Sequence, residues 1–360
     1  MDAAAGPSRS SAGPTVALDG RGAERGTRTL IDGARAAAAD GIRLRVFGDP
    51  AELSALDGTD GVEVVPAAGE ITNDDEPVAS VRSSPEASVV MAAGDVAGGS
   101  SEAMVSAGPT GATMTAALFA LRRSQGVRRP ALALQLAVPG REGPPTVMLD
   151  VGANSEARPG DLVQFAYMGA AFSEAVLGVR SPRVALLSIG VEAGKGTPAL
   201  IEAHATLAAA DGLAFSGNVE GRDLLAGVAD VIVTDGFTGN VVLKTIEGTA
   251  RAVASAVSGA ARSNPIAAAG GLLLRPALGG LHRELDPDTT GGAILLGLRG
   301  VTVVAHGSSG PDGIANAIRL ASRSVEQRAV ERTAALLERS GATRSGLRST
   351  PESQVGSEST

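Results

Sequence analysis

The sequence predicts an α/β protein in which a mainly parallel sheet lies between two layers of helices. Apolar residues make up 44% of the 360-residue chain, enough to bury a large core. Short β-branched or apolar runs alternate with Gly-rich loops and Ala-rich helical stretches. This order is typical of parallel strands joined by crossover helices. We therefore expect a three-layer α/β/α fold.

Five strand–loop–helix units support this expectation. In the third unit, Thr197 and Pro198 are typical of a helix start, because Thr can accept bonds from free amides and Pro needs no donor there. The last unit is expected to end in one long helix over about 312–338. The predicted strands lie at 103–106, 147–150, 184–189, 231–234 and 301–305.

The chain divides into one domain and two tails. Residues 1–14 and 339–360 are rich in Ser, Gly, Pro, Thr and Arg, which predicts disordered tails. The intervening 15–338 is expected to form a single α/β domain. Within it, 263–285 is apolar and interrupted by Pro and Gly, which predicts a hairpin. This hairpin fits either a buried subunit interface or contact with a membrane surface.

Composition excludes several classes of function. The chain has no cysteine, and its three histidines have no zinc-site spacing, so we expect neither a metal nor a cofactor. Aromatic residues make up 2% and the formal net charge is −8, which argues against nucleic-acid binding. The start of the chain lacks signal-peptide character, and no apolar run reaches transmembrane length. A cytoplasmic protein is therefore expected.

The few lysines draw attention to two segments. Only two of the 31 basic residues are lysines, Lys195 and Lys244. Lys195 lies in a Gly-rich loop, whereas Lys244 falls inside a predicted helix and is expected to be solvated or ion-paired. In an open parallel sheet such loops line one edge, where helix amino termini provide a site for phosphate.

Several catalytic motifs are absent from the sequence, and their absence limits the reaction mechanisms to be expected. There is no Walker-type phosphate loop, no Gly-x-Ser-x-Gly turn and no Ser–His–Asp signature, so a covalent acyl-enzyme is not favoured. Bound phosphate can instead displace a thiol from a thioester directly, because a thiol with a pKa of about 8.5 leaves with little help. Such a protein has to hold phosphate and stabilise an oxyanion.

Two blocks carry a family resemblance, 216–223 (SGNVEGRD) and 230–248 (DVIVTDGFTGNVVLKTIEG). Together with shorter pieces they resemble the phosphate acyltransferase (PlsX) family over about 15–325. The shorter pieces are Ser106-Ala107-Gly108, Thr110-Gly111-Ala112, Arg129-Pro130-Ala131, Leu149 to Asn154, Gly190-x-Glu192-x-x-Lys195-Gly196, Gly291-Gly292-Ala293 and His306-Gly307-Ser308-Ser309.

The resemblance implies a fold like that of isocitrate dehydrogenase and phosphotransacetylase. It also implies transfer of a fatty acyl group from acyl carrier protein to inorganic phosphate, giving acyl phosphate for phospholipid synthesis. The implied partners are acyl carrier protein, phosphate, a second copy in a homodimer and a membrane glycerol-3-phosphate acyltransferase. Peripheral contact with the inner face of the plasma membrane is implied as well.

The resemblance also implies roles for single residues. Lys195 and Asn240 match positions that the family uses for turnover, and His306 is a candidate ligand for phosphate or the carbonyl oxygen. The remaining candidates are expected to bind phosphate or substrate: Ser106, Gly108, Thr110, Gly111, Asn154, Gly239 and Ser308.

Departures from the family pattern leave two alternatives open. The loop over 19–24, Pro109 and Ala305 all differ from the residues usual in the family. They motivate a catalytically weakened paralogue that binds acyl chains or a partner acyltransferase. A second alternative is an enzyme that takes the acyl group from acyl-coenzyme A.

Overall fold

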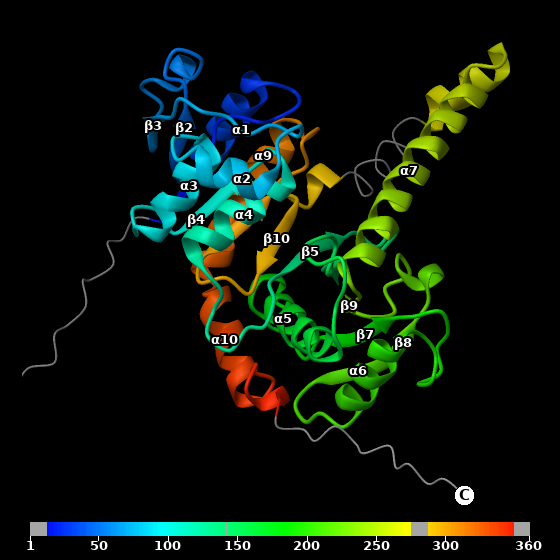
Figure 1. Cartoon of the computed structure of the whole chain (residues 1–360). Helices are drawn as coiled ribbons and strands as arrows, with labels where there is room; N and C mark the ends of the chain where they lie inside the picture. The colour runs from blue at the N-terminus through cyan, green and yellow to red at the C-terminus, as the bar shows by residue number, and fades with distance from the viewer. Residues whose placement is uncertain (1–12, 142, 275–286, 349–360) are drawn as a thin grey trace, which may run out of the picture.

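The computed structural model describes residues 13–141, 143–274 and 287–348 (Figure 1). Its central element is an eleven-stranded sheet in the order β3-β2-β1-β4-β11-β10-β5-β6-β9-β7-β8. The strands are β1 (Thr15–Asp19), β2 (Arg43–Gly48), β3 (Val62–Pro66), β4 (Ala103–Ser106), β5 (Ala131–Leu136), β6 (Thr146–Leu149), β7 (Arg183–Leu187), β8 (Ala214–Val219), β9 (Val231–Val233), β10 (Ala293–Leu296) and β11 (Val301–Val304).

The sheet consists of two parallel groups that run in opposite directions. Strands β3, β2, β1, β4 and β11 form one group, and β6, β9, β7 and β8 form the other. Three successive antiparallel pairs, β11–β10, β10–β5 and β5–β6, separate them. The expectation that all strand-to-helix loops line one edge is therefore wrong. The loops after β4 and β11 lie at one edge, and those after β6, β7 and β9 lie at the other.

Helices cover both faces of the sheet, which confirms the predicted three-layer arrangement (Figure 1). Along β1, Val16 and Leu18 belong to one apolar cluster and Ala17 to the other, as expected for side chains that alternate between faces. The helices are α1 (Thr27–Ala39), α2 (Pro77–Ser83), α3 (Ser88–Ala97), α4 (Thr110–Leu121), α5 (Pro159–Leu177), α6 (Pro198–Ala208), α7 (Gly236–Ala261), α9 (Pro311–Glu326) and α10 (Ala329–Arg339). Single 3-10 turns occur at Ser54–Leu56, Gly221–Asp223, Pro287–Thr289 and Gly346–Arg348.

The long helix expected over 312–338 is two helices. Arg328 adopts a left-handed conformation (φ 54°), which ends α9 and begins α10 in a new direction. No Gly or Pro marks this break in the sequence, so the helical pattern continues across it. Helix α10 then packs against α5, and this tertiary contact offsets the cost of a left-handed non-glycine residue.

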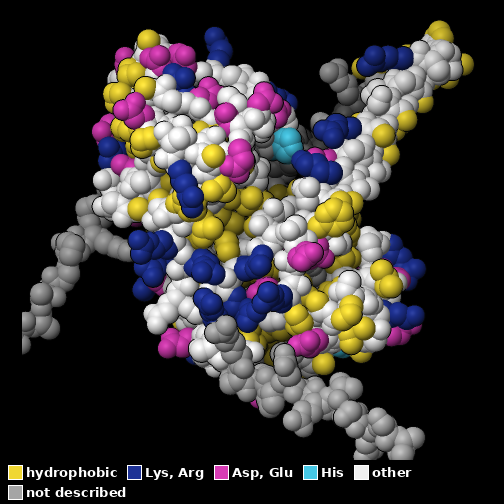
Figure 2. Space-filling view, in the orientation of Figure 1, with side chains coloured by type: hydrophobic (Ala, Val, Ile, Leu, Met, Phe, Trp, Pro, Cys, Tyr) yellow, Lys and Arg dark blue, Asp and Glu magenta, His cyan; other side chains and the backbone are white. Residues whose placement is uncertain are grey.

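The second half of α7 leaves the body of the protein as an arm (Figure 1). Residues 251–260 are all exposed, and residues 265–274 form a further helix. A Cβ placed on Gly271 would lie 2.8 Å from the Cβ of Ala261, so this helix folds back against the end of α7. The expected hairpin is thus helical over its described part, and 275–285 lies outside the described residues. Figure 2 shows hydrophobic side chains along the arm.

The folded chain extends further than the predicted end at 338. Gln164 Nε2 donates to Ala342 O at 2.7 Å, and Arg344 N donates to Gly126 O at 2.7 Å. Ala342 is buried, so 340–348 packs against the α5 region and is not a tail. Residues 1–12 and 349–360 of the predicted tails lie outside the described residues.

Helix α5 approaches the sheet at Gly169. A Cβ there would lie 2.5 Å from Val231 Cγ1 and 2.9 Å from Leu149 Cδ2. Both neighbours belong to strands in the middle of the core, which has little freedom to move. Gly94, in the interior of α3, has no neighbouring atom within 4 Å of the same position.

We expect Gly169→Ala to lower the free energy of unfolding by about 1–3 kcal/mol, because the added methyl overpacks the core. The matched change Gly94→Ala should instead raise it by about 0.5–1 kcal/mol, since alanine favours a helix interior and nothing obstructs it. Urea unfolding of both variants checks the pair. Equal effects would contradict the close approach of α5 to the sheet.

Candidate active site

The loop after β4 is organised around a buried carboxylate. Ser106 Oγ donates to Asp19 Oδ2 at 2.7 Å and accepts from Gly108 N at 3.1 Å, and Thr113 Oγ1 lies 3.0 Å from the same hydroxyl. Ser106 is fully buried, so its hydroxyl shapes the loop from inside. Thr110 begins α4, and Pro109 before it provides no side-chain cap. The amides at the start of α4 are therefore left without that side-chain partner.

The loop after β6 is organised around a second buried carboxylate, that of Asp150. It accepts bonds from the backbone amides of Leu132, Gly152, Ala153 and Asn154 and from Asn154 Nδ2, at 2.8–3.1 Å. Burial raises the pKa of Asp150, and these hydrogen bonds oppose that shift. Asn154 Nδ2 also donates to Pro130 O at 2.7 Å. Asn154, predicted to bind phosphate, thus has its side chain committed to the loop.

Helix α7 begins against this loop. Gly236 N donates to Asn154 O at 2.8 Å, and Asp235 caps the helix by accepting from Thr238 N. A Cβ on Gly239 would lie 1.9 Å from Asp150 O, so only glycine fits there. Gly239 therefore allows a close backbone approach. The next residue, Asn240, is exposed, with its side chain beside Gly152.

Lys195 lies in the loop between β7 and α6. Its N–H donates to Glu192 O at 3.0 Å and its carbonyl accepts from Ser188 Oγ at 2.9 Å, so the backbone is held while the side chain is exposed. Because β7 and β9 are parallel neighbours, this loop and the start of α7 lie at the same edge of the sheet. Within the described ranges, no hydrogen bond or ion pair joins the Lys195 ammonium to another residue.

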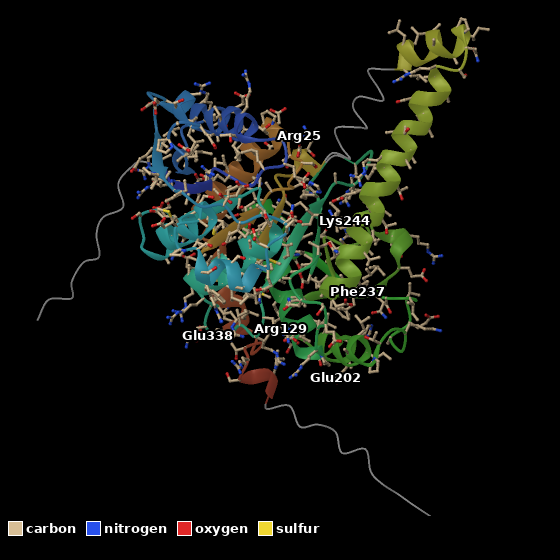
Figure 3. The ribbon with its side chains drawn as sticks, turned by 45° about the horizontal axis from the view of Figure 1, so that its top comes forward. Arg25, Arg129, Glu202, Phe237, Lys244 and Glu338 are labelled. Atoms are coloured by element: carbon tan, nitrogen blue, oxygen red, sulfur yellow. The ribbon has the colours of Figure 1, made fainter. Side chains whose placement is uncertain are left out.

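A charged cluster joins the two edges of the sheet. Lys244 Nζ, one turn beyond Asn240 on α7, lies 3.1 Å from Glu247 Oε2 and 3.4 Å from His306 Nε2. Glu247 Oε1 lies 3.7 Å from the same ring nitrogen. The expectation that Lys244 is an ion-paired helix residue is confirmed. Figure 3 shows Phe237 at the start of α7 and Lys244 further along the same helix.

His306 is oriented by its own loop. Its Nδ1 accepts from Ser308 N at 3.2 Å and lies 2.8 Å from Ser308 Oγ. The His306 ring and the Lys244 ammonium, both beside Glu247, hold the pKa of that carboxyl below its usual range. Glu247 is therefore a carboxylate at neutral pH.

The structure thus gathers some predicted residues and separates others. Asn240 lies one turn before Lys244 on α7, and Lys244 contacts His306, whose ring also contacts Ser308. Gly108 lies in the loop after β4, and Thr110 and Gly111 lie in the first turn of α4; β4 itself neighbours β11. Sequence reasoning missed Asp150 and Glu247. Asp150 ends a predicted strand, and Glu247 lies three residues after Lys244, so a helical i,i+3 pair was the available signal.

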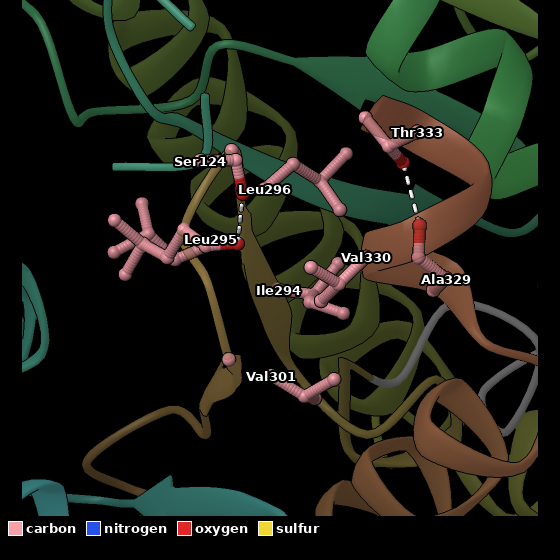
Figure 4. Close-up of a pocket in the computed structure, with 11 residues that line it drawn as sticks. Ser124, Ile294, Leu295, Leu296, Val301, Ala329, Val330 and Thr333 are labelled. Carbon is pink, nitrogen blue, oxygen red and sulfur yellow. Dashed lines mark hydrogen bonds between the residues drawn. The ribbon is translucent and has the colours of Figure 1, made fainter. Parts of the chain in front are cut away.

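Two cavities lie away from these loops. One of about 20 Å³ lies between β10 and α10 and is lined mainly by apolar side chains (Figure 4). A larger one of about 510 Å³ is lined by Gln135, Arg141 and Arg323 among others. No cluster of three or more potential metal-ligating side chains occurs in the described ranges. Among those same residues, none of the helices has the length and hydropathy needed to span a bilayer.

The arrangement suits chemistry on an anion. Helix amides, a carboxamide, two ammonium groups and an imidazole stand at the ends of the strands, all of them hydrogen-bond donors toward a negative oxygen. The fold and the site together define an α/β protein of the phosphate-binding type, with donors from several loops and helix starts.

The comparisons with known proteins refine this class. A family model described as fatty acid synthesis protein matches residues 15–332. The phosphate acyltransferase of Elusimicrobium minutum is 43% identical over 323 residues, covering 86% of this chain and 92% of that protein. The phosphate acyltransferase of Heliobacterium modesticaldum is 42% identical over 319 residues, covering 87% and 94%. The chain belongs to the phosphate acyltransferase family and is an acyltransferase.

Solved structures agree on the fold. A branched-chain phosphotransacylase from Enterococcus faecalis V583 superposes with a TM-score of 0.56 at 17% identity, covering 87% of this chain and 99% of that one. A phosphotransacetylase from Streptococcus pyogenes gives 0.55 at 17% identity, covering 87% and 94%. The phosphotransacetylase-like fold expected from the sequence is therefore confirmed.

Asp19 gives the site a distinct pH dependence. Burial raises its pKa from 3.8 to about 6, although bonds from Ser88, Ser106 and Arg21 oppose the shift. Between these values the folded protein holds a proton that the unfolded chain releases. Stability therefore falls as pH rises, and the difference is complete above about pH 6.

We expect the free energy of unfolding of the wild type to fall by about 2 kcal/mol more than that of Asp19→Asn between pH 4 and pH 7. The exposed Asp60→Asn serves as the control and should follow the wild type. Urea unfolding across this pH range measures the difference. Parallel curves for wild type and Asp19→Asn would show that Asp19 titrates normally.

Proposed function

We propose that this acyltransferase moves a fatty acyl group from acyl carrier protein to inorganic phosphate. The acyl phosphate formed would supply phospholipid synthesis. The observation that carries the proposal is the position of α7, which holds Asn240 one turn from Lys244, the residue that contacts His306. Family membership supports the coarser part of the proposal, acyl transfer to phosphate.

The proposed reaction is a direct displacement. A phosphate oxygen bonds to the thioester carbonyl carbon, the C–S bond breaks, and its electron pair leaves on sulfur. The thiolate then takes a proton from solvent. Lys195 and Asn240 hold phosphate and the developing oxyanion, and His306 donates from its ring. The amides of Thr110 and Gly111 serve as further donors, while Ser106, Gly108, Asn154 and Gly239 support the loops.

We expect acyl phosphate to form with acyl carrier protein as donor, only in the presence of phosphate, with equimolar release of the carrier thiol. Lys195→Ala should lower kcat at least about 100-fold, because it removes a charged donor to the oxyanion. The control Arg251→Ala, on the exposed part of α7, should retain wild-type activity. A coupled assay for carrier release measures all three proteins.

The same assay decides between the proposal and its rivals. Faster turnover with acyl-coenzyme A than with the carrier would favour that donor. Binding of acyl carrier protein without turnover, equally by wild type and Lys195→Ala, would favour a binding protein. Pro109, which leaves α4 without a side-chain cap, is the residue that motivates this second candidate.

We also propose that the arm contacts either a second copy of the chain or a membrane surface, where a glycerol-3-phosphate acyltransferase would receive the product. The side chains of Leu272, Leu273 and Leu274 are 68%, 82% and 57% exposed, which is unusual for three consecutive leucines. An apolar tip of this kind inserts into an interface or a lipid surface.

We expect the triple change of Leu272, Leu273 and Leu274 to Asp to reduce association with anionic liposomes by at least about tenfold, since burying charge among acyl chains is costly. Flotation of the wild type and variant measures the association. Sedimentation of each protein in the absence of lipid serves as the control for dimerisation. Unchanged flotation would exclude the tip as the membrane contact, and loss of the dimer would favour the interface.

A further inference from the structure

The cluster of Lys244, Glu247 and His306 has one carboxylate for two donors. Because a backbone N–H can only donate, the bond from Ser308 N assigns His306 Nδ1 as the bare nitrogen and places the ring proton on Nε2. That N–H faces Lys244 Nζ at 3.4 Å. Two donors cannot bond to each other, so this contact is not a hydrogen bond.

Glu247 supplies the acceptor that makes this contact stable. Its side chain is 8% exposed, and its oxygens lie 3.1–3.7 Å from the two donors. Glu24, in the loop after β1, packs against Gly307, the residue after His306, and its N–H donates to Gly307 O at 2.9 Å. Of the contacts to His306 Nε2 that the described residues make, that of Glu247 is the one from an acceptor.

The outer sides of both donors remain open. The Lys244 side chain is 52% exposed and that of His306 is 33% exposed. At 3.7 Å, Glu247 attracts the Nε2 proton without a full hydrogen bond to it, so the ring remains a donor to an arriving oxygen. A single oxyanion can accept from the ring and the ammonium together.

We propose that Glu247 is a positioning residue for acyl transfer, which holds His306 as its Nε2–H tautomer beside the Lys244 ammonium. This inference rests on the proposed function, since His306 is the residue that would contact substrate. Without the carboxylate, no acceptor stands between the Lys244 ammonium and the His306 Nε2–H, so the two donors repel. The ring then turns away and gives up the bond from Ser308 N that fixes its tautomer. Displacement of a catalytic donor by about 1 Å can reduce turnover 100-fold.

The test pairs a structural readout with kinetics. Nitrogen-15 NMR of the full chain reports the tautomer of each histidine. The sequence has only three, and His306→Gln assigns the signal of interest. The variant Glu247→Gln keeps the shape of the side chain, and Glu247→Asp withdraws the carboxylate by one methylene should the first fail to fold. Glu202→Gln, on the exposed face of α6, is the control.

We expect a single Nε2–H tautomer for His306 in wild type and Glu202→Gln, and a mixture of tautomers in Glu247→Gln. The kcat for acyl phosphate formation should fall about 10–100-fold, with the KM for the acyl donor changed less than about twofold. An unchanged tautomer, or a mixed tautomer with full kcat, would overturn the proposal. Inactivity of the wild type with every donor would count against the proposed function, while a tautomer change in Glu247→Gln would still support the positioning role.

Discussion

The site depends on one buried carboxylate, that of Asp150. Its five hydrogen bonds hold the loop over 150–154 in a fixed shape at the end of β6. In that shape, Asn154 O accepts a hydrogen bond from Gly236 N. Asp150 O lies so close to α7 that only a glycine fits at position 239. Helix α7 therefore starts at one defined position and in one direction. Burying a carboxylate costs free energy of desolvation. The five hydrogen bonds to it offset that cost, and they also order the loop.

The position of α7 then determines the rest of the site. The two groups of parallel strands run in opposite directions, so no single edge of the sheet collects all the loops. Helix α7 connects the two edges. It starts at the end of β9 and reaches the loop after β11, where Lys244 and Glu247 contact His306. Residues from both halves of the sheet meet along one helix face, at the i,i+3 and i,i+4 spacing that a helix provides.

Local patterns explain what could be predicted from the sequence. The five strand–loop–helix units, the start of α6 at Thr197 and Pro198, and the ion pair of Lys244 all follow from short stretches of sequence. The reversal of the sheet could not be predicted, because it depends on β10 and β5 pairing across about 160 residues. The break at Arg328 and the packing of 340–348 were missed for the same reason: both are imposed by contacts with α5 and its neighbours.

The two halves of α7 are stabilised by different interactions. Val242, Leu243 and Ile246 pack against the core, so the first half is stabilised by tertiary contacts. Residues 251–260 are exposed on all sides and gain only helix propensity, which is marginal for so short a segment in water. Val253 and Val257 lower that propensity further, yet they give the arm an apolar surface. A surface that covers these valines would stabilise the arm, and the same helix would then connect that surface directly to the charged cluster at its packed end.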